Sequence, residues 1–124
     1  MEDFPLGITS AECNFYGDRL ILLEGAIEEL LSCLHMIRRY QISRGQRDPI
    51  ASFQARIKSA GSMTAKLERQ GLPITADSAL QDVWDAAGVR LVCPFVQNID
   101  HTVRLIRRIP GIQILREKDY IRNP

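Results

Sequence analysis

The sequence predicts an α/β or α+β domain in which a small sheet is flanked by helices. Three stretches predict this class: a long apolar-periodic segment after Asp18, an alternating stretch over residues 88–95, and another that begins at Ile112 after a helix-like segment. A strand, a crossover helix and a second strand permit a parallel pair. We therefore expect a helical N-terminal part, residues 1–48, followed by a sheet-bearing part, residues 49–124.

Composition limits the classes of protein to consider. The chain has 124 residues, a formal net charge of +1 and 45% hydrophobic residues, as is ordinary for one globular domain. Proteins that wrap DNA or RNA carry a clear basic excess, so we expect no DNA partner. No apolar run approaches the ~20 residues of a membrane span, and the first residues do not resemble a signal peptide. We therefore expect a cytoplasmic protein without membrane contact, whose three cysteines are free thiols.

The longest predicted helix runs from an N-cap at Asp18 to about Ser43, after an irregular segment over residues 1–17. Its apolar positions recur by three and four, which is a heptad-like seam. Such a seam packs either on the core of its own domain or on another subunit, and both interpretations stay open here. The seam residues are Leu20, Leu23, Ile27, Leu30, Leu34 and Ile37.

Residues 53–66 are predicted to lie in a second helix. Asp48 and Pro49 would open it as N-cap and first residue, and it should end near Gly71. A short third helix, capped by Thr75 or Asp77, is expected to follow. The helix prediction sets which side chains share a face, so the interpretation of the basic residues in this stretch depends on it.

Two lysines and a serine recur every four positions in this stretch. At 100° per residue, Lys58, Ser62 and Lys66 share one helical face. Ammonium groups supply point charges for phosphates, and the serine hydroxyl supplies a donor that tolerates a nearby metal. Arg56 falls away from that face, so it would touch another part of the ligand, where its guanidinium plane could stack on a base. The alternative interpretation is a solvated basic face.

A buried strand is predicted over residues 88–95, directly after Asp85. Apolar residues alternate along it, and Arg90 falls on its less apolar side. A carboxylate at a strand start, close to basic residues, suits a Mg²⁺ ion that bridges phosphates. Asp85 could equally be an ordinary turn residue. Trp84, beside it, is expected to pack in the core.

The C-terminal third is predicted to contain a helix capped by Asn98 and then a strand from Ile112. Three arginines of that helix, at positions 104, 107 and 108, are interpreted as a solvated face. Along the strand, Arg116 and Lys118 share one side by period-two counting. That pair offers a guanidinium and an ammonium to a ligand, or lies on an exposed strand face.

Three blocks together resemble the synthetase domain of the RelA/SpoT-type alarmone synthetases, especially the small, single-domain members. The blocks are R-x-K-x3-S-x3-K from Arg56, D-x-x-G-x-R from Asp85 and R-x-K-D-Y-I-x-N-P from Arg116, and they cover roughly residues 49–124. The resemblance implies a GTP pyrophosphokinase of the stringent response, which transfers pyrophosphate from ATP to the 3′-hydroxyl of GDP or GTP and makes (p)ppGpp. It also implies a nucleotidyltransferase-like mixed sheet and a homo-oligomer.

The resemblance implies a role for each matched residue. Arg56 and Arg116 would sandwich the adenine of ATP, and Asp85 would hold the catalytic Mg²⁺. Lysines of all three blocks and Ser62 would bind the phosphates, and Arg90 belongs to the same pocket. The implied ATP-binding set is Arg56, Lys58, Ser62, Lys66, Arg90, Arg116 and Lys118, and the implied catalytic set is Asp85, Lys58 and Lys66.

In the family, the chain continues past the third block. A glycine-tyrosine motif there supplies a tyrosine that stacks on guanine, and a later strand supplies a glutamate that serves as base and metal ligand. Neither follows Pro124. We therefore expect an incomplete sheet and a chain that carries the ATP-side half of the site and makes no (p)ppGpp alone. The alternative hypothesis is a non-catalytic nucleotide-binding or oligomerisation module.

Overall fold

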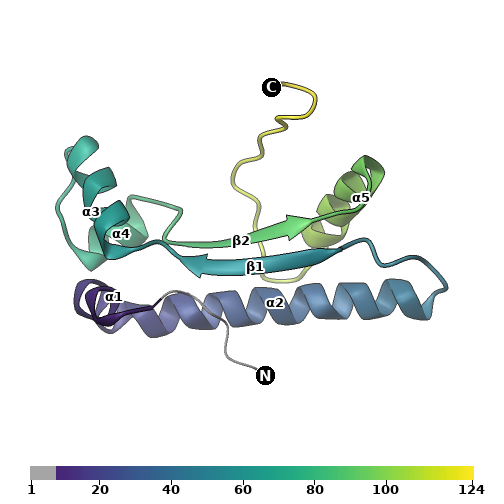
Figure 1. Ribbon diagram of the computed structural model, residues 1–124, viewed down its shortest axis with the longest axis horizontal. Coiled ribbons are helices and arrows are strands. Elements are labelled where there is room, and N and C mark those ends of the chain that lie inside the picture. Colours follow the sequence, from purple (N-terminus) through teal and green to yellow (C-terminus); the bar gives the residue numbers. More distant parts are fainter. Residues whose placement is uncertain (1–7) are drawn as a thin grey trace. The chain divides into compact units, whose positions relative to one another are not determined.

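The structure is a computed structural model that describes residues 8–124. It has the α+β character that the sequence predicts, but its strands β1 and β2 pair antiparallel, so the parallel pair is not formed within these residues (Figure 1). No helix of the described chain is long and apolar enough to cross a membrane. The elements are α1 (Ser10–Tyr16), α2 (Arg19–Ser43), β1 (Ser52–Ile57), α3 (Ala60–Arg69), α4 (Ala76–Gln81), β2 (Ala87–Val92) and α5 (Val96–Arg107).

The chain divides into two compact units. The first comprises the described residues up to Ser32 together with Ser52–Val92, and the second comprises Cys33–Ala51 and Cys93–Pro124. Helix α2 contributes its first part to one unit and its last part to the other. Each unit is described below by itself.

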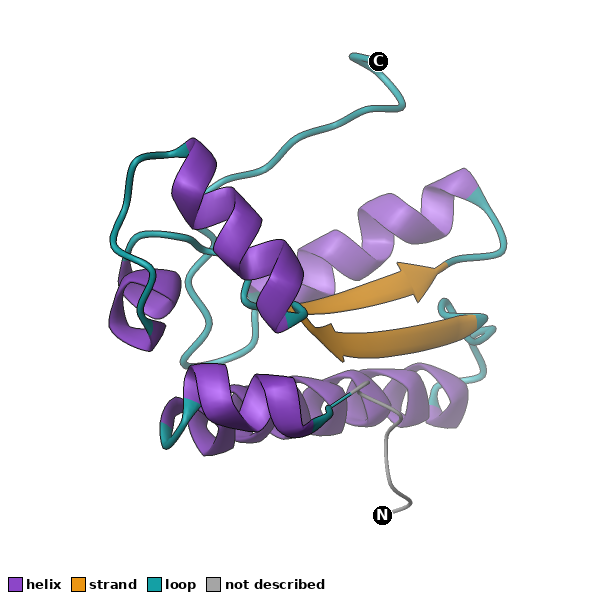
Figure 2. Cartoon of the chain, turned by 60° about the vertical axis from the view of Figure 1, so that its left-hand side comes forward, coloured by secondary structure: helices purple, strands orange, loops and turns teal. Residues whose placement is uncertain are grey.

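The sheet of the first unit is a two-stranded antiparallel ribbon, shown in orange in Figure 2. Its register places Phe53 opposite Leu91 and Ala55 opposite Val89. These apolar side chains are half-buried on one face, whereas Gln54 and its neighbours on the other face are exposed. Alternation of this kind is typical of a sheet that covers a core on one side only.

The helix predicted over residues 53–66 is wrong in its first half. Residues up to Ile57 form β1, and α3 begins only at Ala60, after an N-cap at Ser59 whose hydroxyl accepts from the Ser62 amide at 3.2 Å. The predicted N-cap Asp48 instead accepts from the Ile50 amide at 3.0 Å. The period-two alternation of Phe53 to Ile57 and the available partner strand outweigh the four-residue spacing of the polar residues.

The long N-terminal helix is confirmed as α2, but the segment before it is not irregular throughout. Residues Ser10–Tyr16 form α1, whose N-cap Thr9 and third residue Glu12 make a capping box. The part of the predicted segment over residues 1–7 lies outside the described residues. Most of the predicted seam is buried along α2, with Leu31 in place of Leu30. Its buried members are Leu20, Leu23, Ile27, Leu31 and Leu34.

Of two further local predictions, the cap of the third helix is confirmed and the burial of Trp84 is wrong. Thr75 does cap a short helix, α4, through a hydrogen bond from the Ser78 amide at 3.2 Å. Trp84, expected in the core, is 73% exposed, because it lies in the turn before β2 while Val83 and Ala86 occupy the buried positions on either side. Its indole N–H donates to the Gln81 carbonyl at 3.4 Å.

In the second unit, α5 begins one turn earlier than predicted. Its N-cap is Phe95, and Asn98 lies inside the helix, where its side-chain oxygen accepts from the Phe95 amide at 3.2 Å. The strand predicted from Ile112 is not formed, and residues 112–119 have no regular structure. Ion pairs to α5, among them Arg122–Asp100, hold this segment instead. All three cysteines are free thiols, as predicted.

Candidate functional site

Three of the sequence-predicted site residues meet at one carboxylate oxygen in the first unit. The ammonium nitrogens of Lys58 and Lys66 donate to Asp85 Oδ2 at 3.0 Å and 2.8 Å. The two lysine side chains are 19% and 27% exposed, whereas that of Asp85 is 47% exposed. The cluster therefore has a net positive charge, and its carboxylate is open to solvent.

The sheet and α3 bring these three residues together. The Lys58 amide donates to the Ala86 carbonyl at 2.7 Å, which extends the β1–β2 ladder by one residue and places Lys58 beside Asp85. Lys66 lies on α3, which is held by the fully buried side chain of Met63. Because each lysine is fixed by a buried part of its own element, the convergence does not depend on the exposed ion pairs alone.

Helix α1 braces the loop that carries Lys58. The Tyr16 hydroxyl donates to the Lys58 carbonyl oxygen at 2.6 Å. Glu12 accepts from the Ala60 amide, the first of α3, at 2.9 Å and from the Thr9 hydroxyl at 2.6 Å. Sequence analysis missed this brace; the capping-box pattern of Thr9 and Glu12 was visible, but nothing in it indicated the contact with α3.

The electrostatics of the cluster follow from these contacts. Partial burial raises the pKa of Asp85, but the hydrogen bonds from Lys66 and Lys58 outweigh it, so the pKa is held below its ordinary value. Burial, together with the nearby Glu12 and Asp85 carboxylates, raises the pKa of Tyr16 to about 12. At neutral pH, Asp85 is therefore ionised, and Tyr16 keeps the proton with which it donates to the loop.

Two of the predicted adenine- and phosphate-binding arginines lie on the exposed face of the sheet. The register sets Arg56 opposite Gly88 and Arg90 opposite Gln54, so both arginines share one face and are diagonal neighbours. Lys58 continues this ladder two positions after Arg56, which corrects the helical-wheel prediction that Arg56 points away from the lysines. A shallow hollow of about 640 Å³ is lined by Phe53, Gln54, Ala55, Arg56, Gly88, Val89 and Arg90.

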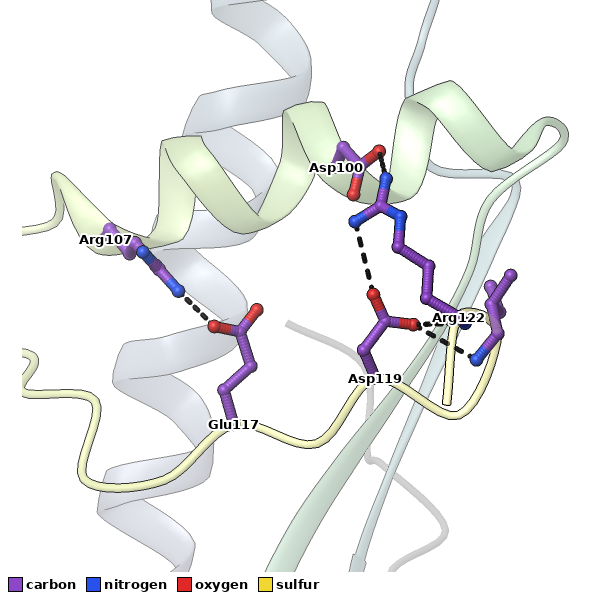
Figure 3. A network of polar contacts seen from close by, with 6 residues as sticks. Asp100, Arg107, Glu117, Asp119 and Arg122 are labelled. Atoms are coloured by element: carbon purple, nitrogen blue, oxygen red, sulfur yellow. Dashed lines mark hydrogen bonds and ion pairs between the residues drawn. The ribbon is translucent and has the colours of Figure 1, made fainter. Parts of the chain in front are cut away.

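The remaining predicted site residues, Ser62, Arg116 and Lys118, lie in different units of the chain. Ser62 is exposed on α3, one turn before Lys66, so these two residues do share a helical face. Arg116 and Lys118 belong to the second unit and are exposed in the segment after α5. Between them, Glu117 pairs with Arg107 of α5, as Figure 3 shows.

The chemistry of the cluster fits a magnesium ion that is brought in with a polyphosphate. Mg²⁺ prefers oxygen ligands and is commonly held by one or two carboxylates together with substrate phosphates. Asp85 supplies such a carboxylate. No group of three or more His, Cys, Asp or Glu side chains gathers in the described part of the chain, so a cage made only of protein ligands is not available there.

Comparison with known proteins identifies relatives for most of the chain. A family model described as the region found in RelA/SpoT proteins matches residues 55–124. GTP pyrophosphokinase YwaC of Bacillus subtilis is 31% identical over 108 residues, which are 86% of this chain and 51% of that protein. The chain thus spans about half the length of the curated relatives that it matches.

Solved structures agree with these sequence relatives. The small alarmone synthetase 2 of Bacillus subtilis superimposes with a TM-score of 0.75 at 27% identity, covering 88% of this chain and 54% of that one. The small alarmone synthetase 1 of the same organism, solved bound to its product pppGpp, gives a TM-score of 0.73 at 26% identity, covering 83% and 52%. Its complex with AMPCPP gives 0.71 at 26% identity, covering 82% and 53%.

Proposed function

This chain belongs to the RelA/SpoT family, and from that premise we propose that it carries the ATP-binding side of a GTP pyrophosphokinase site. In the proposed reaction, the 3′-hydroxyl of GDP or GTP attacks the β-phosphorus of ATP. AMP leaves, and the transferred pyrophosphate makes (p)ppGpp. Phosphoryl transfers of this kind depend mainly on positioning and on neutralising the charge of the transferred group.

The observation that carries the proposal is the convergence of Lys58 and Lys66 on Asp85. Without nucleotide, the carboxylate neutralises part of the charge of two ammonium groups. When a polyphosphate binds, both ammonium groups can turn to its oxygens, and Asp85 is released to face a metal ion. Its low pKa keeps it ionised for that role.

The arginines of the sheet face complete the donor side. Arg56 and Arg90 are exposed beside a hollow that has the size of a small-molecule site. We propose that Arg56 stacks on the adenine, and that Arg90 adds charge near the phosphates, with Ser62 as a further donor. Arg116 and Lys118 would join from the second unit, as their positions in the family motif imply.

Magnesium is the proposed cofactor, and Asp85 is the residue that would hold it. When bound, Mg²⁺ would withdraw charge from the phosphate oxygens. The chain's own residues bind and orient: the lysines neutralise the phosphates, and the hydrogen bond from Tyr16 fixes the loop that carries Lys58. AMPCPP, an ATP analogue, was bound to a structural relative, which supports a donor site of this kind.

The proposal is tested by titrating the 124-residue chain with AMPCPP and Mg²⁺ in a calorimeter. We expect saturable binding that Lys58→Ala or Lys66→Ala weakens by at least about tenfold, since a hydrogen bond to a charged group contributes roughly 1.5–3 kcal/mol. The same preparation should form no (p)ppGpp from ATP and GDP, because the matched residues account for the donor side only. Saturable binding that both variants retain unchanged would contradict the assigned site.

The matched control is Arg69→Ala, which removes a cation from the same helix. Arg69 is exposed in the last turn of α3, whereas the ion pairs of Asp85 are with Lys58 and Lys66. If Arg69→Ala weakened AMPCPP binding as much as Lys66→Ala did, the effect would reflect general surface charge rather than the cluster. Circular dichroism of each variant would show whether the helices remain.

We also propose that the chain self-associates through α2. The buried seam lies along one side of this helix, and the opposite side carries large exposed apolar residues. Leu22 is 62% exposed and Met36 is 58% exposed. At 100° per residue these two fall within a narrow sector opposite Ile27, and the exposed Glu29 lies between them. A surface helix normally has a polar outer face, so large exposed apolar side chains in this stripe favour a second copy of the chain.

A further inference from the structure

The second unit contains a hollow whose lining does not belong to the proposed donor site. Its volume is about 360 Å³, which is at the small end of the range for small-molecule sites. It lies between the last turns of α2 and one side of α5. The lining residues are Tyr40, Gln41, Arg44, Gln46, His101, Leu105 and Arg108.

The turn that ends α2 builds one wall of this hollow. The Gln46 amide donates to the Gln41 carbonyl at 2.9 Å, and the Gly45 amide donates to the Ile42 carbonyl at 3.0 Å. This is a Schellman motif, and its glycine has the positive φ of 76° that the motif requires. The turn folds Gln46 back beside Gln41, whose side chain is buried. The turn thus brings two glutamines to the same wall.

The lining is strongly cationic, and no acidic residue is part of it. Other arginines of the second unit are neutralised, such as Arg38 by Asp48 and Arg107 by Glu117. Within the part of the chain that the structure describes, no carboxylate pairs with Arg44 or Arg108. Two guanidinium groups facing one hollow without a counter-charge create a local positive potential that favours an anion.

Arg44 is exposed to solvent and contacts Tyr40, one turn earlier in α2. Its guanidinium carbon lies 5.7 Å from the centroid of the Tyr40 ring, and its Nη1 donates to the Tyr40 hydroxyl at 3.2 Å. Such stacking orders the planar fork that binds phosphate through two parallel hydrogen bonds. Tyr40 itself is 55% exposed, so part of its ring remains available to a ligand.

We propose that this hollow binds a small phosphorylated molecule that carries a flat ring. Arg44 and Arg108 would hold the phosphate, with His101 and the amides of Gln41 and Gln46 as further donors. The ring would lie against Tyr40. The site is separate in its residues from the proposed donor cluster, so either proposal can fail while the other stands.

The test is a titration of the 124-residue chain followed by nuclear magnetic resonance, with phenyl phosphate and inorganic phosphate as probes. Constant ionic strength removes general screening effects. We expect saturable shifts of the Gln46 and Leu105 amides with both probes, and tighter binding of phenyl phosphate. Following these amides reports on the hollow alone, even if a probe also reaches Asp85 and its lysines.

Two double variants provide the comparison. Arg44→Gln with Arg108→Gln should weaken phenyl phosphate binding by at least about tenfold. Arg39→Gln with Arg104→Gln removes the same charge from exposed positions on the same two helices and should leave the affinity within about twofold. Equal losses in the two double variants would overturn the proposal, as would the absence of saturable shifts in the unmodified chain.

Two further outcomes concern the nature of the ligand. Tyr40→Leu should remove most of the preference for phenyl phosphate over inorganic phosphate while the helical circular dichroism is unchanged. If the preference persisted, the ring contact would be refuted. If a short single-stranded oligonucleotide displaced phenyl phosphate at far lower concentration, the hollow would be part of a nucleic-acid surface, and the small-ligand proposal would be overturned.

Discussion

At the scale of single residues, Asp85 accepts two ammonium donors at one oxygen and so restrains the charges that a phosphate would use. The distances to Lys58 and Lys66 are 3.0 Å and 2.8 Å. These pairs are partly exposed, and each contributes on the order of 0.2–1 kcal/mol. A ligand can therefore break them at small cost. If the proposed site is correct, the carboxylate should oppose phosphate binding when no metal is present and assist it when a metal is bound.

Asp85→Asn separates these two effects. The amide no longer neutralises the lysines, so we expect AMPCPP to bind about two- to fivefold more tightly without Mg²⁺. Addition of Mg²⁺ should then increase the AMPCPP affinity of the variant only slightly, whereas it should increase the AMPCPP affinity of the unmodified chain. Calorimetric titrations with and without Mg²⁺ measure both. Asp77→Asn, which removes the carboxylate paired with Arg19 at 2.5 Å, serves as the control. A full Mg²⁺ effect in Asp85→Asn would contradict the metal role.

Glu12 predicts a dependence of stability on pH. Hydrogen bonds from the Ala60 amide, and from the hydroxyl and amide of Thr9, lower its pKa from 4.5 to about 2. A lowered folded-state pKa means that the unfolded chain binds the proton more readily. The stabilisation is therefore complete above pH 4.5, declines as the pH falls and is gone below about pH 2.

The test is Glu12→Gln, compared with the unmodified chain by thermal unfolding at several pH values. The variant should have a lower Tm at pH 7, and the difference should shrink as the pH falls from 4.5 towards 2. Glu28→Gln, at an exposed position on α2, should show no such convergence. A difference in Tm that stayed constant across this range would show that the charge of Glu12 is not what stabilises the contact.

At the scale of elements, the local structure around the candidate site differs from the prediction, although three of the predicted residues lie together. Lys58, Lys66 and Asp85 do meet, yet the helix used to bring the lysines together does not exist before Ala60. Ser62 and Lys66 do lie one turn apart on α3, but Lys58 precedes this helix, so the spacing from Lys58 to Ser62 is not a helical one. Short stretches such as residues 53–57, with apolar residues at both two- and four-residue spacing, satisfy both periods, and only the partner strand decides between them.

Long elements were predictable because many residues agree. Helix α2 repeats its apolar spacing over 25 residues, so its bounds were predicted within one residue. The strand expected from Ile112 shows the opposite case, because alternation alone does not supply a hydrogen-bonding partner. Within residues 8–124 no strand pairs with this segment, and ion pairs connect it to α5. Trp84 was misplaced because turn residues between two buried neighbours can face solvent, and composition does not reveal this.

Ion pairs connect α5 to the segment that carries Arg116 and Lys118; we call the residues of these pairs, which are Asp100, Arg107, Glu117, Asp119 and Arg122, the latch. Arg122 donates to Asp100 at 2.7 Å and to Asp119 at 3.2 Å, and Arg107 pairs with Glu117 (Figure 3). All of these side chains are at least one-third exposed. Each pair therefore contributes little to stability and is weakened by salt.

We expect Arg122→Ala to speed amide hydrogen exchange over residues 112–124 by about twofold to fivefold at low salt. The unmodified chain should approach the same rates as the salt concentration rises to about 1 M, where the Debye length falls to ~3 Å. Arg104→Ala, an exposed position of α5 outside the latch, should leave the rates unchanged. Exchange that was independent of both salt and Arg122 would show that the ion pairs do not hold the segment.

At the scale of the whole molecule, α2 is the element that both compact units share. Its first part supplies buried residues such as Leu23 and Ile27 to one unit, and its last part supplies Leu34 to the other. The seam of this helix is therefore buried within the chain. This agrees with the first interpretation of the heptad-like pattern, in which the seam packs on the core of its own domain. Burial of the seam does not account for the exposed stripe on the other side of α2, which contains Leu22 and Met36.

Self-association through this stripe is tested with Leu22→Glu combined with Met36→Glu. Both side chains are more than half exposed, so the substitutions should change the free energy of unfolding by no more than about 0.5 kcal/mol each if the chain is a monomer. We expect the unmodified chain to sediment as a multiple of 14.1 kDa and the double variant to sediment as a single 14.1 kDa chain.

The control for this experiment is Arg39→Glu, which adds negative charge on the flank of α2, outside the stripe. It should keep the mass of the unmodified chain. If the unmodified chain sedimented at 14.1 kDa over the accessible concentrations, the stripe would not mediate self-association. If it sedimented as an oligomer and the double variant did too, the contact would lie elsewhere on the chain. A lower mass together with a lower Tm in the double variant would mean that association and folding are coupled through α2.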